Sequence, residues 1–450
     1  MKQIKNFQQL GLISTSAFVV ANMIGTGVFT SLGFQLKGIN NIVAVLSLWV
    51  IGGVIALCGS LVYGELGAAM PRSGGEYHYL SKIYHPAIGF LSGWVSMTVG
   101  FAAPVALASM ALGRYTARVF QGVSHTGIAL CAISVITVIH CYNVKFGSAF
   151  QTVFTTFKVL LILTFIICGF VLTPSLQDLS GSIKGFTFKS LLSPGYVVSM
   201  VYVTYAFSGW NASAYIANEI KDPQRNIPRS LFLSTLLVTI LYLLLNFIFL
   251  LTTPVSELTG QVEVGFISAG KIFGSTGGNI MGLFISVLLI STISSMIFVG
   301  PRVSQVMGED ISILHFLSYK TNSGIPLYAI LLQFCISFIL VITSSFDKVL
   351  IYSGFTLNLF TFLTVLGVFI HRIKYKDVER PYKTWGYPVV PILFLFIILV
   401  VIGYLLYQNT TESVLGLATV LFGYILYFIN KCYVKPAAGS KNNNLSKDNN

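Results

Sequence analysis

The chain has 450 residues, of which 55% are hydrophobic and only 9% are charged, and its mean hydropathy is +0.81. Soluble domains average about 25% charged residues, so this composition excludes a soluble globular protein. Apolar windows of about 20 residues or more recur along the whole sequence, which predicts a multi-pass helical protein in a lipid bilayer. The net charge of +13 lies mostly in the loops between these windows and does not indicate nucleic-acid binding.

Twelve helical membrane spans are predicted. With the N-terminus inside, the inner segments hold 19 Lys and Arg and the outer segments hold seven. Positive residues concentrate on the cytoplasmic side of a membrane, so we expect both termini in the cytoplasm and the protein in the cell (cytoplasmic) membrane. The spans lie near residues 11–36, 41–69, 87–113, 127–143, 149–173, 195–218, 230–252, 278–306, 327–345, 349–371, 388–407 and 412–433.

The first span carries an unusual break, Gly25-Thr26-Gly27, near its middle. Two glycines around a threonine are poor helix formers. Open backbone at membrane depth is tolerated only where it is buried in protein or lines a cavity. We therefore expect the helix to be interrupted here and its freed N–H and C=O groups to form a polar site. Close helix packing is the alternative explanation of the two glycines, but a second break in the sixth span favours the site.

Two ionisable residues lie inside predicted spans. Glu65 is near the inner end of the second span, where it either couples protons or is held by residues of an inner gate; the second interpretation is favoured. Lys158 is about ten residues into the fifth span, roughly 15 Å from the membrane face, where a charge costs about 2.5–3.5 kcal/mol. It either bonds carbonyls of the broken first span as a structural lysine or takes part in transport. Candidate partners in the eighth span are Ser291, Ser294 and Ser295.

A second break, at Ser208-Gly209, interrupts the sixth span at a depth similar to the first. The segments 11–173 and 195–371 have similar lengths, and each opens with an interrupted helix. This pattern predicts an inverted repeat of five helices each, with a substrate site where the two breaks meet. The other segments are a cytoplasmic N-terminus (1–10), two peripheral helices (388–433) and a polar tail (434–450) that we expect to be disordered.

Several motifs in this order resemble the amino acid–polyamine–organocation superfamily of transporters. They are IGTGVF at 24–29, YGELGAAMPRSGGEY at 63–77 and EIKDPQRNIP at 219–228. Two further runs, FSGWN at 207–211 and RPYK at 380–383, resemble the L-type amino acid transporter branch most. The resemblance covers about residues 8–433.

The resemblance implies an all-α membrane fold of the leucine-transporter type, with ten core helices, breaks in helices 1 and 6, and two peripheral helices. It also implies an amino acid substrate. The carboxylate of the substrate would meet the N–H groups of Thr26 and Gly27, and the amino group of the substrate would meet carbonyls of the two breaks. This agrees with the preference of helix N-termini for anions and of C-termini for cations. The implied binding residues are Met23, Ile24, Gly25, Thr26, Gly27, Tyr205, Ala206, Phe207, Ser208 and Gly209.

Tyr205 and three further residues are predicted to gate or support this site. By its position in the family, Tyr205 is favoured as the gate, although aromatic residues are more often simple core residues. Trp210 and Asn211 follow the second break, and Asn211 is expected to tie the unwound backbone to the first span. Tyr352 is a weaker gate candidate.

The resemblance also bears on which ion is coupled to transport. Lys158 is similar to a lysine that replaces a bound sodium ion in related transporters, so no sodium is expected there. It is predicted to be either a proton carrier or a permanent charge. No cofactor or metal is expected, because the six histidines are not spaced as ligands; a proton is the one candidate coupling ion.

These features predict a secondary transporter of L-amino acids, not an enzyme, that works by alternating access as a symporter or an exchanger. Neutral substrates are favoured over arginine, lysine or glutamate, because the sequence places no second charged residue at the breaks to pair with a charged substrate side chain. An amino acid sensor that has lost transport is the alternative, and a membrane enzyme is a remoter one. L-type transporters of animals join a heavy subunit through a cysteine in the outer loop after span 3. That loop here, 114–126, has no cysteine, so no disulfide-linked subunit is expected.

Overall fold

A computed structural model describes residues 9–39, 41–142, 148–173 and 185–433. The predicted N-terminal segment falls largely outside the described residues, and the predicted tail at 434–450 falls outside them entirely. The described part of the chain is helical, apart from loops and one isolated bridge between Leu10 and Ile220.

The described residues of the first half of the chain form eight α-helices and one π-helical turn. Asn41 caps α3 by accepting a hydrogen bond from the Ala44 N–H at 3.0 Å, and Pro86 occupies the first turn of α5, where its missing N–H is not needed. The elements are α1 (Leu12–Met23), α2 (Gly27–Gln35), α3 (Ile42–Ala69), α4 (Glu76–Ile83), α5 (Pro86–Val95), a π-helix (Ser96–Gly100), α6 (Ala102–Val119), α7 (His125–Tyr142) and α8 (Ser148–Leu172).

The second half also begins with a short helix and continues with longer ones. Within α14, Gly274 has φ 76° and ψ −179°, so that element is two helical segments joined at a kink. Three 3₁₀ turns lie at Phe188–Leu192, Ala217–Glu219 and Ser312–Ser318. The α-helices are α10 (Pro194–Ala206), α11 (Ala212–Tyr215), α12 (Pro223–Thr252), α13 (Val255–Leu258), α14 (Val264–Asp310), α15 (Leu327–Thr343), α16 (Phe346–Lys374), α17 (Val389–Gln408) and α18 (Thr410–Tyr433).

Ten helical stretches of the described residues are long and apolar enough to cross a membrane, so the chain is a multi-pass membrane protein. The first of them joins α1 and α2 across residues 24–26. Two of the twelve predicted spans are not among these ten. The span at 195–218 contains α10, which has only 13 residues, and the span at 327–345 contains α15, which has 17.

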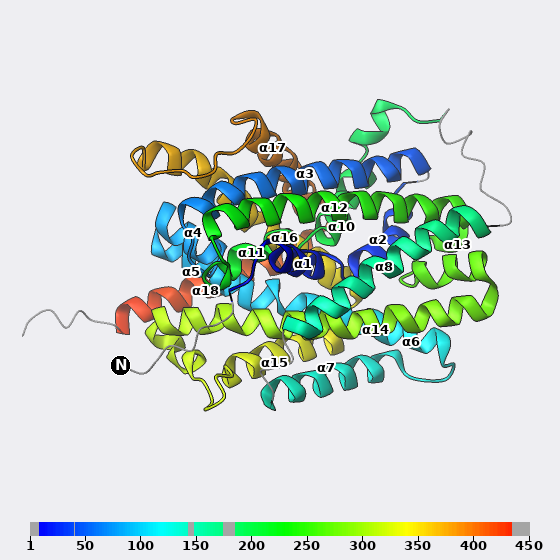
Figure 1. The fold of residues 1–450 in the computed structure, drawn as a ribbon, viewed down its shortest axis with the longest axis horizontal. Coiled ribbons are helices and arrows are strands. Elements are labelled where there is room, and N and C mark those ends of the chain that lie inside the picture. Colours follow the sequence, from blue (N-terminus) through cyan, green and yellow to red (C-terminus); the bar gives the residue numbers. More distant parts are fainter. Residues whose placement is uncertain (1–8, 40, 143–147, 174–184, 434–450) are drawn as a thin grey trace, which may run out of the picture.

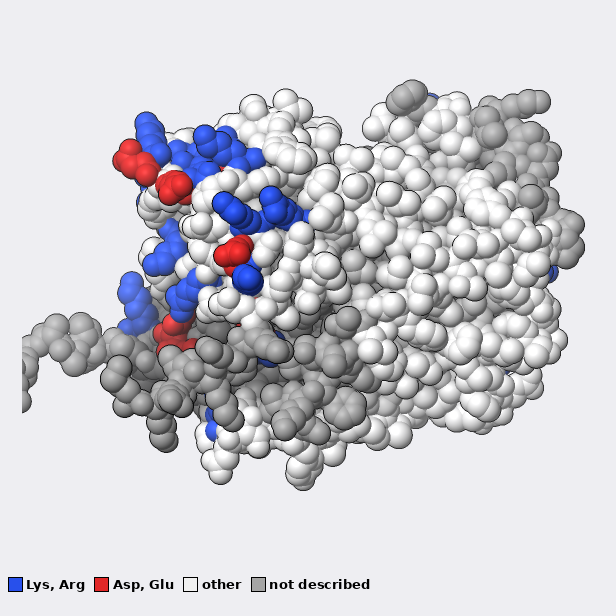
Figure 2. All heavy atoms as spheres, in the orientation of Figure 1, with Lys and Arg blue, Asp and Glu red and all other residues white. Residues whose placement is uncertain are grey.

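The long helices run side by side along the length of the molecule, and α1 lies in the middle, between α12 and α14 (Figure 1). Charged side chains gather at one end of the face in Figure 2, and the larger remaining part of that face is uncharged. An uncharged belt of this kind is what the hydrocarbon of a bilayer covers.

Glu65 ties α3 to α16 and to the segment that follows α16. Arg372 donates to both carboxylate oxygens, from Nε at 2.8 Å and from Nη2 at 2.6 Å. The Thr384 N–H and hydroxyl each donate to Oε2 at 2.7 Å, and Arg380 lies 3.8 Å away. The carboxylate has no exposed surface. This arrangement matches the interpretation of Glu65 as a carboxylate held in place by neighbouring residues, rather than as a proton-coupling group.

Replacing Glu65 with glutamine leaves Arg372 and Arg380 facing a neutral side chain in a largely buried place. Breaking a buried ion pair costs about 3–5 kcal/mol, so we expect Glu65→Gln to lower the apparent melting temperature in detergent clearly. The matched control is Glu257→Gln, which breaks the exposed Lys271–Glu257 pair, worth about 0–1 kcal/mol. Equal melting temperatures for the two variants would contradict this role.

Candidate functional site

The first break lies between the end of α1 and the start of α2, at Ile24, Gly25 and Thr26. Ile24 is extended, with φ −75° and ψ 90°, so the carbonyls around it lose their helical partners. Such groups need other donors when they are buried. The Met23 carbonyl accepts a hydrogen bond from the Tyr242 hydroxyl of α12 at 2.6 Å.

Lys158 of α8 supplies the other donor at this break. Its side chain is buried, with 1% exposed. Its ammonium donates to the carbonyl of Ile24 at 2.9 Å and to that of Ala21 at 3.4 Å. The third hydrogen bond, at 3.0 Å, goes to the Thr292 hydroxyl of α14. The expected contact between Lys158 and the broken first helix is therefore present in the structure, and all three N–H groups have partners.

The predicted hydroxyl partners of Lys158 were wrong, because the ammonium bonds the hydroxyl of Thr292, which follows Ser291 in the sequence. None of the three hydrogen bonds of the ammonium goes to Ser291, Ser294 or Ser295. Each residue of a helix points about 100° away from the one before it, so Thr292 reaches the ammonium where its neighbour Ser291 does not. Ser294 instead bonds the imidazole of His140 on α7, at 2.8 Å.

The second break separates α10, which ends at Ala206, from α11, which begins at Ala212. The Ser208 N–H bonds back to the Tyr205 carbonyl at 2.9 Å, and Gly209 has φ +93°. This left-handed conformation suits glycine. A Cβ on Gly209 would also lie 2.6 Å from the Asn22 carbonyl oxygen, so this position has no room for a side chain.

The two breaks are in direct contact. Gly209 lies against the end of α1, and Gly27 at the start of α2 lies against the end of α10, where a Cβ would be 2.4 Å from the Ala206 Cα. The Thr26 and Tyr205 hydroxyls are 3.3 Å apart. The residues predicted to bind the two ends of an amino acid are thus brought together, although they are about 180 positions apart in the sequence.

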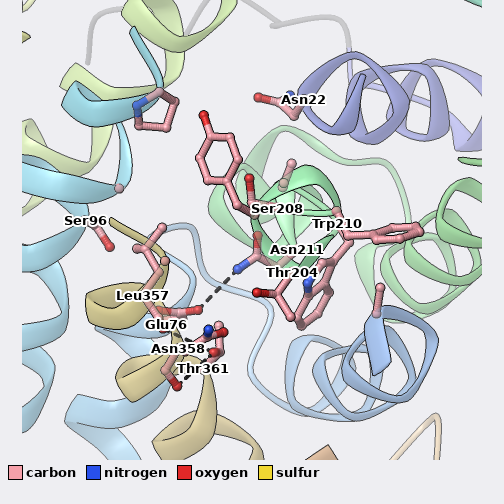
Figure 3. A pocket seen from close by; sticks show the side chains of 18 of the residues that line it. Asn22, Glu76, Ser96, Thr204, Ser208, Trp210, Asn211, Leu357, Asn358 and Thr361 are labelled. Carbon is pink, nitrogen blue, oxygen red and sulfur yellow. Dashed lines mark hydrogen bonds between the residues drawn. The ribbon is translucent and has the colours of Figure 1, made fainter. Parts of the chain in front are cut away.

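A cavity of about 110 Å³ opens beside this contact (Figure 3). Asn22 borders it from α1, and the second break borders it from Tyr205 and from Phe207 through Asn211. Residues 23–27 are not among its lining residues. The cavity therefore meets the second break and the last turn of α1, while the N-terminus of α2 is packed against α10.

The gate and support residues differ in their placement. Tyr205 and Trp210 line the cavity, and the Trp210 ring packs on Tyr63 at 4.7 Å between centroids. Asn211 was predicted to tie the break to the first span, and this prediction was wrong: its Nδ2 donates to Glu76 Oε1 of α4 at 3.2 Å. Tyr352 is not among the residues that line the cavity; its hydroxyl lies 2.9 Å from the Thr419 hydroxyl of α18. The Tyr352 prediction was wrong.

Glu76 was missed as a site residue, although it stands in the quoted run at 63–77. It begins α4, has 3% of its surface exposed, and lines the cavity. Oε1 accepts hydrogen bonds from Asn211 and from the Tyr63 hydroxyl. Burial raises the pKa of the Glu76 carboxyl to about 7, against the lowering effect of these two hydrogen bonds. An acidic residue after two glycines, between two apolar spans, was the available signal.

Comparison with known proteins assigns the family. The profile of the amino acid permease family matches residues 10–429. The b(0,+)-type amino acid transporter 1 of Mus musculus is 28% identical over 435 residues, covering 94% of this chain and 88% of that protein. The large neutral amino acids transporter small subunit 2 of Homo sapiens is 28% identical over 445 residues, covering 94% of this chain and 80% of that protein.

A bacterial relative covers nearly all of both chains. The serine/threonine exchanger SteT of Bacillus subtilis is 28% identical over 428 residues, which is 94% of this chain and 96% of the exchanger. The matched family and these relatives are transporters, not enzymes, as the sequence motifs predict. Because the profile spans nearly the whole chain, this protein belongs to the amino acid permease family.

Proposed function

We propose that this protein is a secondary active transporter of L-amino acids that works by alternating access. The observation that carries the proposal is the contact between the two helix breaks, beside a cavity in the interior of a membrane protein. Transporters built from inverted repeats bind substrate where two interrupted helices meet. The proposal includes twelve spans, with five-helix repeats at 11–173 and 195–371 and peripheral helices at 388–433.

The chemistry of the breaks fits a zwitterion. The N-terminus of α2 presents the free N–H groups of Thr26 and Gly27, which favour a carboxylate. The C-terminal ends of α1 and α10 present carbonyls that favour an ammonium group. Because Gly27 packs on Ala206 here, binding in this mode requires the two breaks to move apart. A site that opens and closes between two packed helices suits alternating access.

Contacts on both sides of the breaks support an occluded conformation. Phe34 of α2 stacks between Tyr202 and Phe346, with ring centroids 5.6 and 5.7 Å apart. Beyond the second break, Glu219 pairs with Arg302 of α14 at 3.2 Å. Alternating access would break these two sets of contacts in turn.

We assign Lys158 the role of a permanent charge rather than a proton carrier. Its three N–H groups all have acceptors, and losing a proton would leave one acceptor without its donor. The ammonium joins α1 to α14 through Ile24 and Thr292. Since the resemblance implies that a lysine here replaces the sodium ion of related transporters, the proposal includes no sodium ion at this place.

Neutral amino acids are the proposed substrates. Among the described residues, Lys158 is the charged side chain that hydrogen-bonds to the first break, at Ile24, and its three hydrogen bonds are already used. The names of two of the three relatives refer to large neutral amino acids and to serine and threonine, which agrees with this choice. Flux by exchange or by proton symport is compatible with the site.

The proposed location is the cell membrane with both termini in the cytoplasm, because Lys and Arg are concentrated in the inner segments. No disulfide-linked heavy subunit is proposed, since the loop 114–126 has no cysteine. A stand-alone prokaryotic permease fits both points.

The function is tested by uptake into proteoliposomes. We expect radiolabelled L-serine or L-leucine to accumulate, and a panel of unlabelled neutral amino acids to compete better than arginine, lysine or glutamate. The assay is run with and without a pH gradient and with and without internal amino acid, which separates symport from exchange. Binding without flux would support a sensor in place of the transporter, and chemical conversion of the amino acid would support an enzyme.

Replacing Lys158 with methionine removes three hydrogen bonds from a charged donor, each worth about 1.5–3 kcal/mol. We expect Lys158→Met to reduce uptake at least about tenfold, the effect of losing about 1.4 kcal/mol, while any residual uptake keeps the pH dependence of the wild type. Lys82→Met, at an exposed lysine of α4, should transport normally. Monodisperse elution of both variants shows that they fold. Full uptake by Lys158→Met with lost pH dependence would identify a proton carrier instead.

A further inference from the structure

Glu76 is unusual among the buried carboxylates of the described residues. Glu65 pairs with Arg372 at 2.6 Å, and Glu263 pairs with Arg118 at 3.7 Å. No Lys, Arg or His of the described chain lies within ion-pair distance of Glu76, which is equally buried. A buried carboxylate without a cation must either stay protonated or gain a positive partner.

The two oxygens of Glu76 have different surroundings. Oε1 accepts from the Tyr63 hydroxyl and from Asn211, whereas none of the described residues donates a hydrogen bond to Oε2. Glu76 lines the cavity together with Asn358 and Thr361 of α16, and Asn211 donates a hydrogen bond to it from the second break (Figure 3). Asn358 Nδ2 is buried in the cavity lining and is likewise unpartnered. This end of the cavity is therefore polar, and some of its hydrogen-bonding groups have no protein partner.

The cavity is large enough to bring a proton to this carboxylate. A water molecule needs about 10–15 Å³ of such space and two to four polar partners, and the cavity has about 110 Å³. Ser96, Ser208 and Thr361 line it together with Glu76. A chain of several waters fits between the carboxylate and the second break.

We propose that Glu76 is the proton-binding residue of the transport cycle, taking up a proton from water in this cavity and releasing it there. The inference rests on the proposed transport function and adds its coupling site. Lys158 and Glu65, the residues first considered for this role, have their hydrogen-bonding and charge partners already in place. Glu76 alone of the three combines burial, a cavity and the absence of a counter-charge.

The groups that surround Glu76 are neutral. Tyr63 comes from α3, Tyr79 from α4 itself and Tyr215 from α11, and their hydroxyls are the titratable groups with which its charge interacts. The cavity lining on the π-helix and on α16 supplies only uncharged side chains near it, and Glu76 is the one ionisable carboxyl or base among the described lining residues. Since burial raises the pKa of Glu76 to about 7, the carboxyl is mostly protonated below that pH and mostly ionised above it.

Asn211 links this protonation to the moving part of the site. A hydrogen bond to an ionised carboxylate is roughly twice as strong as one to a neutral group. Ionised Glu76 therefore holds Asn211, and with it the segment between α10 and α11, against α4. Protonation weakens this link and leaves the second break freer to move when substrate binds.

The direct test is an infrared titration of the reconstituted full-length protein. We expect a carbonyl band of a protonated carboxyl that disappears with a midpoint near pH 7 in the wild type and is missing in Glu76→Gln. The control is Glu309→Gln, which removes an exposed carboxylate paired with Lys320 and should keep the band. The proposal is overturned if Glu76→Gln removes no band that titrates near neutral pH.

The second measurement is counterflow of radiolabelled L-serine and L-leucine between pH 6 and pH 8 in the same proteoliposomes. Rates in the wild type and in Glu309→Gln should change severalfold across this range, and those in Glu76→Gln should change less than about twofold, as expected once the group with a pKa near 7 is gone. Wild-type counterflow with an unchanged pH dependence in Glu76→Gln overturns the coupling role alone. No counterflow in the wild type overturns the transport function itself.

Discussion

The centre of this structure depends on the hydrogen bonds that the Lys158 ammonium donates to the first helix break. An interrupted helix inside a membrane leaves carbonyls that neither lipid nor a neighbouring turn can bond. Lys158 bonds the Ala21 and Ile24 carbonyls, and Tyr242 bonds that of Met23. These donors come from α8 and α12, so the break is held open by the helices around it. With the Thr292 hydroxyl as its third partner, the buried ammonium is stabilised, and α1, α8 and α14 are joined at one point.

The second constraint is the close approach of the two breaks. Gly27 and Gly209 each lie where a Cβ would collide with the backbone of the other broken segment, so the breaks touch without side chains between them. The charges around this contact have different roles. All three N–H groups of the Lys158 ammonium have acceptors at or near the first break. Glu76 has no positively charged partner among the described residues and contacts the second break through Asn211. In the mechanism that we propose, Lys158 is a fixed charge at the first break, and Glu76 is a titratable group linked to the second break.

Features that depend on local sequence were predictable, and those that depend on tertiary contacts were not. Glycines and apolar length indicated the membrane class, the ends of α1 and α10, and a lysine that bonds the first break. The partner of Lys158 depends on which side of α14 faces α8. Neighbouring positions on a helix point in different directions, so Thr292 was missed in favour of nearby serines. Asn211 and Glu76 are 135 positions apart, and Tyr352 faces a peripheral helix. No periodicity in the sequence carries these pairings.

The most direct test of the central claim is a cryo-electron microscopy structure of the protein with its amino acid bound. The account predicts density between the two breaks, with the substrate carboxylate about 2.7–3.2 Å from the N–H groups of Thr26 and Gly27. The ammonium should face the carbonyl ends of α1 and α10, and Gly27 should have moved away from Ala206. Amino acid density elsewhere, with Gly27 still packed on Ala206, would contradict the account.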